Sequence, residues 1–274
     1  MSRLVRGAGL VALWAAASGA SAADRVSTYH CSGPCPQGAS EINEIVVRES
    51  YTLSSNGITK FADWVAYRVT PDSIGPSEGR TWETDSWLRT GETLTPKAYD
   101  GASSALRVDR GHQAPLASLS GTPFAEQTNI LSNITPQASA LNQGAWVRLE
   151  DQERKLAKRL NGPVFVLTGP LYERMMRPLP SGPASQRVPS GYWKVVSLPD
   201  GRRTAFIFDQ AAPRKLDFCA GRVSLTYVQL RSRLRLFPVA DDIEPIALDK
   251  ELGCTNARSA PPTPDDIPLE STAR

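Results

Sequence analysis

The stretch Arg107-Val108-Asp109-Arg110-Gly111-His112-Gln113-Ala114-Pro115 places acidic, basic and imidazole side chains within a few residues of one another. The run that leads into it, residues 106–108, predicts a short β-strand. The chain has only two histidines, and His112 is the one in this setting. A neutral imidazole is the natural general base near neutral pH, which makes His112 the candidate base. Gly111 is expected to permit a tight bend beside it.

A second set of polar residues lies on a helix predicted over residues 139–160, where leucine and alanine recur near helical spacing and Asn161-Gly162-Pro163 ends the pattern. Asn142 offers a neutral amide oxygen to a metal ion. Glu150 follows about 80° around the helix axis, and Arg154 is spaced for an ion pair with it. Mg²⁺ takes oxygen ligands and keeps several waters, so it needs few protein ligands. Together with His112 and Arg110, these residues predict a metal-assisted phosphodiester hydrolysis site.

Each candidate also has an ordinary structural explanation. His112 in a polar loop can be a surface or structural residue. Asn142 can be a helix N-cap, which asparagine favours. Glu150 and Arg154 can form an exposed ion pair of little consequence, and Arg80 can be a solvated loop residue.

The first 22 residues have the order of a signal peptide. Arg3 and Arg6 precede an apolar stretch over residues 8–17, and Ala20-Ser21-Ala22 offers a small-residue cleavage site. No later apolar run is long enough to cross a bilayer. We therefore expect a secreted or periplasmic protein that does not bind a membrane, with a domain over residues 23–254.

The four cysteines are expected to form disulfides in an oxidising compartment. The simplest pairing is Cys31–Cys35 and Cys219–Cys254, which is one of three connectivities. A zinc site built from Cys31, Cys35 and His30 is the alternative.

The remaining pattern alternates strands and helices without a regular βαβ rhythm, which favours an α+β domain with a largely antiparallel sheet. The loop-rich segment 71–100 is long enough to suggest a functional loop. The tail, residues 255–274, is rich in proline and polar residues and is expected to be disordered. The predicted strands cover residues 44–53, 59–70, 164–167, 192–198 and 204–208, with a turn at 54–57 and a second helix at 223–234.

The formal charge of the full chain is +3. Removal of residues 1–22 takes away Arg3 and Arg6 and no acidic residue, which leaves +1. The chain is not globally basic, so a nucleic-acid site would need a local positive potential.

Four motifs in this order resemble the DNA/RNA non-specific endonuclease family, whose site is a ββα-metal motif. They are Asp109-Arg110-Gly111-His112-Gln113-Ala114-Pro115, Leu131-Ser132-Asn133-Ile134-Thr135-Pro136-Gln137, Leu141-Asn142-Gln143-Gly144-Ala145-Trp146 and Leu149-Glu150-Asp151-Gln152-Glu153-Arg154. The likeness extends roughly from Cys31 to Cys254. It implies an α+β fold in which helices flank a central, largely antiparallel sheet.

The resemblance also implies a role for each site residue. His112 matches the general base and Asn142 the single direct protein ligand of Mg²⁺, for which Mn²⁺ can substitute. The other matches are Glu150 as the acid that holds metal-bound water, Arg80 and Arg110 as phosphate-binding arginines, Asn133 as a supporting polar residue and Arg154 as an arginine at the edge of the site. Arg80 is assigned only from Trp82 and from its spacing to His112.

The implied activity is hydrolysis of DNA and RNA to products with 5′-phosphates, by a secreted enzyme. The resemblance supports the disulfide pairing above and allows a homodimer, although residues 174–190 and 221–252 match weakly and the tail after Cys254 has no counterpart. Two alternatives are a nucleic-acid-binding protein without catalysis and a phosphodiesterase for small substrates.

Overall fold

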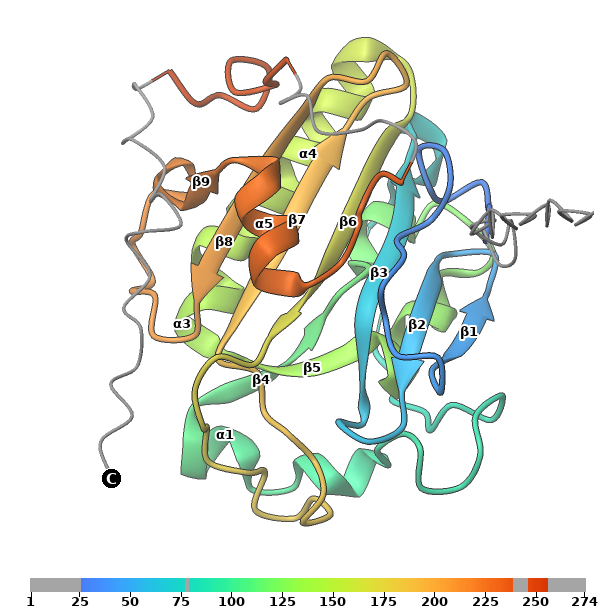
Figure 1. Ribbon diagram of the computed structural model, residues 1–274, viewed down its shortest axis with the longest axis vertical. Coiled ribbons are helices and arrows are strands. Elements are labelled where there is room, and N and C mark those ends of the chain that lie inside the picture. Colours follow the sequence, from blue (N-terminus) through green and yellow to red (C-terminus); the bar gives the residue numbers. More distant parts are fainter. Residues whose placement is uncertain (1–25, 77–78, 239–245, 256–274) are drawn as a thin grey trace, which may run out of the picture.

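The structure is a computed structural model that describes residues 26–76, 79–238 and 246–255. Its centre is a seven-stranded antiparallel sheet of strand order β1-β2-β3-β6-β7-β8-β9 (Figure 1). This confirms the predicted α+β class with a largely antiparallel sheet. The strands are β1 (Glu44–Val47), β2 (Thr52–Asn56), β3 (Phe61–Val69), β6 (Val164–Leu171), β7 (Gly191–Ser197), β8 (Arg203–Asp209) and β9 (Arg222–Val223).

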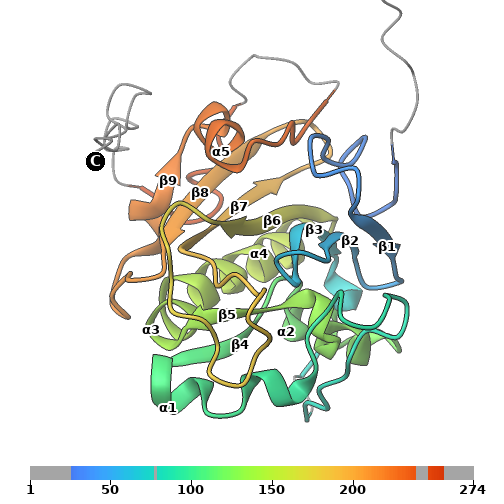
Figure 2. The ribbon, with the colours of Figure 1, turned by 60° about the horizontal axis from the view of Figure 1, so that its bottom comes forward.

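Both faces of the sheet are covered. Helix α4 (Val147–Leu160) packs on one face and helix α5 (Leu225–Ser232) on the other (Figures 1 and 2). Side chains alternate between faces along a strand, so Tyr192 and Val196 of β7 join the core under α4, while Trp193 and Val195 join the core under α5. This explains why β7 is buried along its whole length.

A separate two-stranded sheet carries the opening motif. Strand β4 (Val108–His112) pairs with β5 (Ile134–Ala138) in antiparallel register, with His112 opposite Ile134. Helix α1 (Ala102–Leu106) precedes β4, and α2 (Leu116–Leu119) follows it. After β5 the chain enters α3 (Ser139–Leu141) and then α4. The order β4, β5 and helix is the ββα arrangement that the resemblance implies.

The helix predicted over residues 139–160 is interrupted, so the expectation of one continuous helix is wrong. A π-helical segment, Asn142–Trp146, separates α3 from α4, and Gly144 inside it has φ −117° and ψ −118°. A Cβ at Gly144 would lie 2.7 Å from the carbonyl oxygen of Arg214. The missing side chain therefore lets the backbone of Arg214 approach this bend.

The predicted first strand is also divided. The chain reverses between β1 and β2, where the N–H of Arg48 donates to the carbonyl of Tyr51 at 2.9 Å. The predicted turn at residues 54–57 lies three residues too early, because β2 continues to Asn56 and the turn covers residues 57–60. The Asn56 side chain accepts from the N–H of Ile58 at 2.9 Å, and Lys60 takes the left-handed φ of 73° that completes the reversal.

The two predicted disulfides are present. Cys31 pairs with Cys35, and Cys219 pairs with Cys254. The zinc alternative is wrong, because Cys31 and Cys35 form a disulfide and have no thiolate to offer a metal. The third candidate ligand, His30, has its Nδ1 2.9 Å from Thr52 Oγ1.

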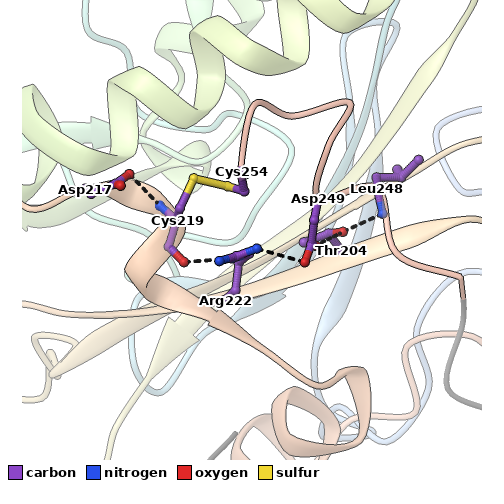
Figure 3. The surroundings of a disulfide bond; sticks show 7 residues. All are labelled: Thr204, Asp217, Cys219, Arg222, Leu248, Asp249 and Cys254. Atoms are coloured by element: carbon purple, nitrogen blue, oxygen red, sulfur yellow. Dashed lines mark hydrogen bonds and ion pairs between the residues drawn. A yellow bond between two sulfur atoms is a disulfide. The ribbon is translucent and has the colours of Figure 1, made fainter. Parts of the chain in front are cut away.

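The second disulfide joins two segments that hydrogen bonds also connect (Figure 3). The guanidinium of Arg222 donates to the carbonyl of Cys219 and to Asp249, at 2.9 Å each. Asp249 in turn accepts from Thr204 Oγ1 of β8 at 2.9 Å. The C-terminal segment is thus fastened to the edge of the sheet.

The predicted signal peptide, residues 1–22, and almost all of the tail, residues 255–274, lie outside the described residues. Among the residues that are described, no helix is long and apolar enough to span a membrane.

Candidate active site

A cavity of about 730 Å³ opens beside β4. Its walls come from β4, the start of α2, the π-helical segment, α4 and the loop that precedes α1. Six of the seven predicted site residues line it, and the seventh, Asn133, does not. The six are Arg80, Arg110, His112, Asn142, Glu150 and Arg154.

His112 ends β4 with its ring partly buried and facing the cavity. Its Nε2 lies 3.0 Å from Asn129 Oδ1. Since an amide oxygen can only accept, Nε2 carries the proton and Nδ1 keeps the lone pair. The centre of the Trp82 ring lies 5.4 Å from the centre of the imidazole, which limits the orientations that the imidazole can take.

Burial lowers the pKa of His112 to about 4, and the positive charge of Arg80 also lowers it, against the opposing effect of the Asn129 hydrogen bond. The imidazole is therefore neutral at pH 7 and available to accept a proton.

We expect neither histidine of the metal-free protein to titrate between about pH 8 and about pH 5.5, because His30 is also held neutral by burial, with a pKa of about 4. Nuclear magnetic resonance of the two imidazole side chains measures this, and a His30→Gln variant assigns the signals. Because both histidine pKa values are lower in the folded chain than in the unfolded chain, the free energy of unfolding is expected to decrease as the pH falls from about 6.5 to about 4. A His112 signal that titrates near 6.5 would contradict this environment.

Asp109 orients the side chain of Asn142. Its Oδ2 accepts from Asn142 Nδ2 and from Gln143 Nε2, at 2.8 Å each, and its Oδ1 accepts from Ser139 Oγ at 2.6 Å. The amide nitrogen of Asn142 is thus committed, and its Oδ1 has no partner among the described residues. Asn142 has helical φ and ψ of −55° and −50°, so the N-cap explanation is wrong.

Glu150 lies on α4 with 8% of its surface exposed. Burial raises its pKa to about 7, while Lys194 lowers it. Lys194 is a buried residue of β7 whose Nζ lies 3.6 Å from Glu150 and 3.1 Å from Glu153. Glu153 also accepts from the Tyr67 hydroxyl at 2.8 Å. This network sits directly behind the Glu150 carboxylate.

Glu150 and Arg154, which are both within the described part of the chain, do not form the predicted ion pair. Arg154 instead bonds to Asp151, one helical turn before it, and donates to Ser118 Oγ at 3.1 Å. Its guanidinium is therefore held at the rim of the cavity.

The other two arginines differ in how firmly they are held. Arg110 donates to the carbonyl of Pro96 at 2.9 Å, and its guanidinium lies 5.5 Å from the centre of the Trp82 ring and 5.2 Å from that of Tyr99. Arg80 is exposed and has no hydrogen bond or ion pair within the described part of the chain. Both place positive charge at the cavity, where an anionic group would need it.

Asn133 is buried and acts on the backbone. Its Nδ2 donates to the carbonyls of Ala114 at 3.0 Å and Thr128 at 2.8 Å, and its Oδ1 accepts from the N–H of Ala114 at 2.8 Å. These bonds join the segment after His112 to the segment before Asn129. The predicted supporting role of Asn133 therefore has a structural basis outside the cavity wall.

Sequence reasoning missed several contributors. Asn129, Arg214, Lys194 and Glu153 were not singled out. A lysine inside the otherwise apolar Tyr192–Val196 run was a detectable signal, because a buried lysine needs a partner; the others had no comparable signal. Gly111 lies within β4 rather than in a bend, and a Cβ there would meet the Gln137 side chain at 2.6 Å.

The donors around the cavity suit a hard divalent cation. The free amide oxygen of Asn142 and the carboxylate of Glu150 are both oxygen ligands, which Mg²⁺ prefers. In the described residues, no group of three or more His, Cys, Asp or Glu side chains is placed to hold a metal. An ion here would therefore keep most of its shell as water.

Comparisons with known proteins agree on one family. Residues 27–231 match the family model described as DNA/RNA non-specific endonuclease. The chain is 46% identical over 252 residues to a nuclease of Serratia marcescens, and the match covers 88% of this chain and 94% of that protein. It is 30% identical over 223 residues to nuclease C1 of Cunninghamella echinulata var. echinulata, covering 72% and 84%.

A more distant sequence match is mitochondrial endonuclease G of Homo sapiens, with 32% identity over 139 residues that cover 49% of this chain and 45% of that one. Among solved structures, the crystal structure of an EndoG/EndoGI complex matches with a TM-score of 0.59 and 21% identity, over 70% of this chain and 85% of that chain. At this identity the structural match concerns the fold alone.

Proposed function

The chain belongs to the DNA/RNA non-specific endonuclease family, and we propose that it hydrolyses DNA and RNA to 5′-phosphate products with His112 as general base and Mg²⁺ held at Asn142. The observation that carries the proposal is the cavity itself. It combines a neutral imidazole, an amide oxygen without a partner among the described residues, a buried carboxylate and four arginines around one space.

The proposed step begins with water beside His112. Nδ1 takes a proton from the water as its oxygen attacks phosphorus in line, and the bond between phosphorus and the 3′ oxygen breaks. The 3′ oxygen takes up a proton from solvent and leaves as a hydroxyl, the phosphate stays on the 5′ side, and His112 afterwards releases its proton to solvent. Asn129 engages Nε2, which leaves Nδ1 as the ring nitrogen that would accept the proton of the water.

Positive charge on the protein stabilises the phosphate as negative charge develops on its oxygens. Arg80 and Arg110 are proposed to bind these oxygens, with Arg154 at the edge. Asn142 would hold the metal directly and Glu150 through water, and when bound the metal supplies a Lewis acid for phosphate charge. Mn²⁺ is expected to substitute, because it also accepts oxygen ligands.

Contacts of this kind account for a lack of base specificity. Arginine and amide groups that bind phosphates fix the position of the backbone but carry no sequence information. The net charge of the chain is small, so the local arginines must provide the attraction.

Digestion of plasmid DNA and of RNA, with Mg²⁺ and again after addition of EDTA, tests the proposal. Cleavage of both polymers that EDTA abolishes is expected. A binding protein without catalysis would retain nucleic acid without cutting it. A small-substrate phosphodiesterase would cleave a nitrophenyl phosphodiester and leave both polymers intact.

Replacement of Asn142 by alanine is expected to raise the Mg²⁺ concentration needed for half-maximal cleavage by at least about tenfold, because the direct protein ligand is lost. A metal titration of the initial rate measures the change. Gln143→Ala is the matched control, since it removes the other amide that bonds to the same oxygen of Asp109. Equal metal midpoints for Asn142→Ala and the native chain would remove Asn142 from the metal site.

We propose export to the periplasm or the exterior, with removal of residues 1–22. The two disulfides support this, since such bonds persist in oxidising compartments. Mass measurement of the mature chain tests the cleavage site before Ala23. A homodimer, which the resemblance allows, is tested by sedimentation of the same material.

A further inference from the structure

Trp87 is an exposed aromatic residue on the loop that also carries Trp82. About 60% of its surface is exposed, whereas three other tryptophans in the described residues are at most 1% exposed. The guanidinium of Arg48 lies 4.0 Å from the centre of the Trp87 ring. Because Arg48 covers one face of the ring, the exposed area lies on the opposite face and the edge.

The support beneath the ring is firmly held. Arg48 bonds to Asp85 at 2.5 Å, and the two side chains are 5% and 0% exposed. The same carboxylate accepts from the N–H of Trp87 at 2.9 Å and from Ser132 Oγ at 2.6 Å. The ring is therefore held on a buried ion pair, which reduces the rotamer freedom that binding a ligand would remove.

The loop is tied to the segment that positions the candidate base. The N–H of Glu83 donates to the carbonyl of Asn129 at 3.4 Å, and the N–H of Leu131 donates to the carbonyl of Glu83 at 2.8 Å. Asn129 is the residue that holds His112. The loop lies at the lower right of the molecule in Figure 1, below β1 and β2.

The position of Trp87 relative to the cavity can be bounded. Trp82 lines the cavity, and a fully extended chain of five residues spans at most roughly 18 Å. With the B-form rise of about 3.4 Å per nucleotide, a strand covers that distance in at most about five nucleotides. Trp87 is thus at most about five nucleotides of strand from the part of the cavity wall that Trp82 forms.

We propose that Trp87 is a stacking platform for an unpaired nucleobase, a few nucleotides from the scissile phosphate. This inference rests on the proposed function and adds a subsite to it. Every base has a π-face, so stacking binds a strand without reading its sequence. Asp85 neutralises Arg48, so this subsite holds the base and leaves the phosphates to the cavity. A duplex keeps its bases paired, so the subsite favours single strands.

The first test compares KM for a single-stranded oligonucleotide with KM for its duplex. We expect Trp87→Ala to raise the ratio of single-strand KM to duplex KM by about 5- to 150-fold, the range for loss of one base-stacking aromatic residue. Trp87→Phe is expected to keep most of the native ratio, because it retains a ring. Trp87→Leu retains apolar area without a ring and is expected to resemble alanine. Equal changes of KM on both substrates, or none on either, would overturn the proposal.

The second test measures binding without cleavage. In a metal-free His112→Ala protein, the tryptophan emission is titrated with a single-stranded oligonucleotide, with and without the additional change Trp87→Phe. Stacking predicts that part of the quenching disappears with Trp87, while the part due to Trp82 in the cavity remains. Identical quenching in both proteins would overturn the proposal. If the native chain cuts neither substrate, the proposed function fails, and this titration still decides the role of Trp87.

Discussion

Replacement of His112 by alanine is expected to lower kcat for DNA and for RNA by at least about 10²-fold, the low end of what a positioned general base contributes. The imidazole is the group in the cavity whose lone pair is available at neutral pH, because its pKa is lowered to about 4 and Nε2 is engaged by Asn129. Single-turnover cleavage at saturating Mg²⁺ measures the chemical step, so that a change in binding is not mistaken for a change in catalysis.

His30→Gln is the matched control, because it alters the only other histidine of the chain. His30 contacts Thr52, and neither residue lines the cavity. Asn129→Ala should give a smaller loss than His112→Ala, since it frees the ring without removing the base. Cleavage by His112→Ala at the native rate would assign the proton transfer to another group.

Replacement of Lys194 by methionine is expected to lower the free energy of unfolding by about 3–5 kcal/mol, the usual cost of removing one partner from a buried ion pair. Lys194 is fully buried, its Nζ contacts Glu153, Glu150 and the Tyr67 hydroxyl, and it lies 4.2 Å from the centre of the Trp146 ring. Without it, two buried carboxylates would face each other with no cation between them. Urea denaturation of the oxidised protein measures the change.

Lys158→Met is the matched control, because it makes the same substitution at an exposed position of α4. Surface substitutions usually change the free energy of unfolding by no more than about 0.5 kcal/mol. Adding Glu153→Gln to Lys194→Met should restore part of the loss, since it removes one of the two unpaired charges. Equal stabilities of the Lys194 and Lys158 variants would show that the network contributes nothing net to folding.

Local patterns predicted the elements that carry the site. The β-branched and aromatic runs of β7 and β8 and the leucine repeat of α4 are readable from side-chain periodicity. The strand predicted over residues 106–108 is displaced, because Leu106 ends α1 and the strand covers Val108–His112. Predictions from these patterns were wrong where a single contact sets the local backbone conformation. Gly144 breaks the predicted helix because the backbone of Arg214, seventy residues away in sequence, packs against it. The turn after β2 moved because one asparagine side chain satisfies the backbone beyond it.

The same limit applies to the site. Motif order was enough to name the residues around the cavity, but not their partners. The spacing of Glu150 and Arg154 predicted an ion pair, yet burial sets Glu150 against Lys194 of a distant strand while Arg154 turns to Asp151. Likewise, nothing near Asn129 in sequence indicates that it would hold His112. Contacts between segments that are distant in sequence produce no periodic pattern in the sequence, so they can be identified only once the fold is known.

We propose that the one cavity hydrolyses both DNA and RNA, because its contacts are to the phosphodiester group and not to the sugar. Competition measures this most directly: the initial rate of cleavage of a labelled DNA oligonucleotide is followed at increasing concentrations of unlabelled RNA of the same sequence. A shared cleft predicts purely competitive inhibition, with an inhibition constant equal to the KM for RNA measured alone. Non-competitive inhibition, or cleavage of the two polymers at independent rates, would contradict a single shared site.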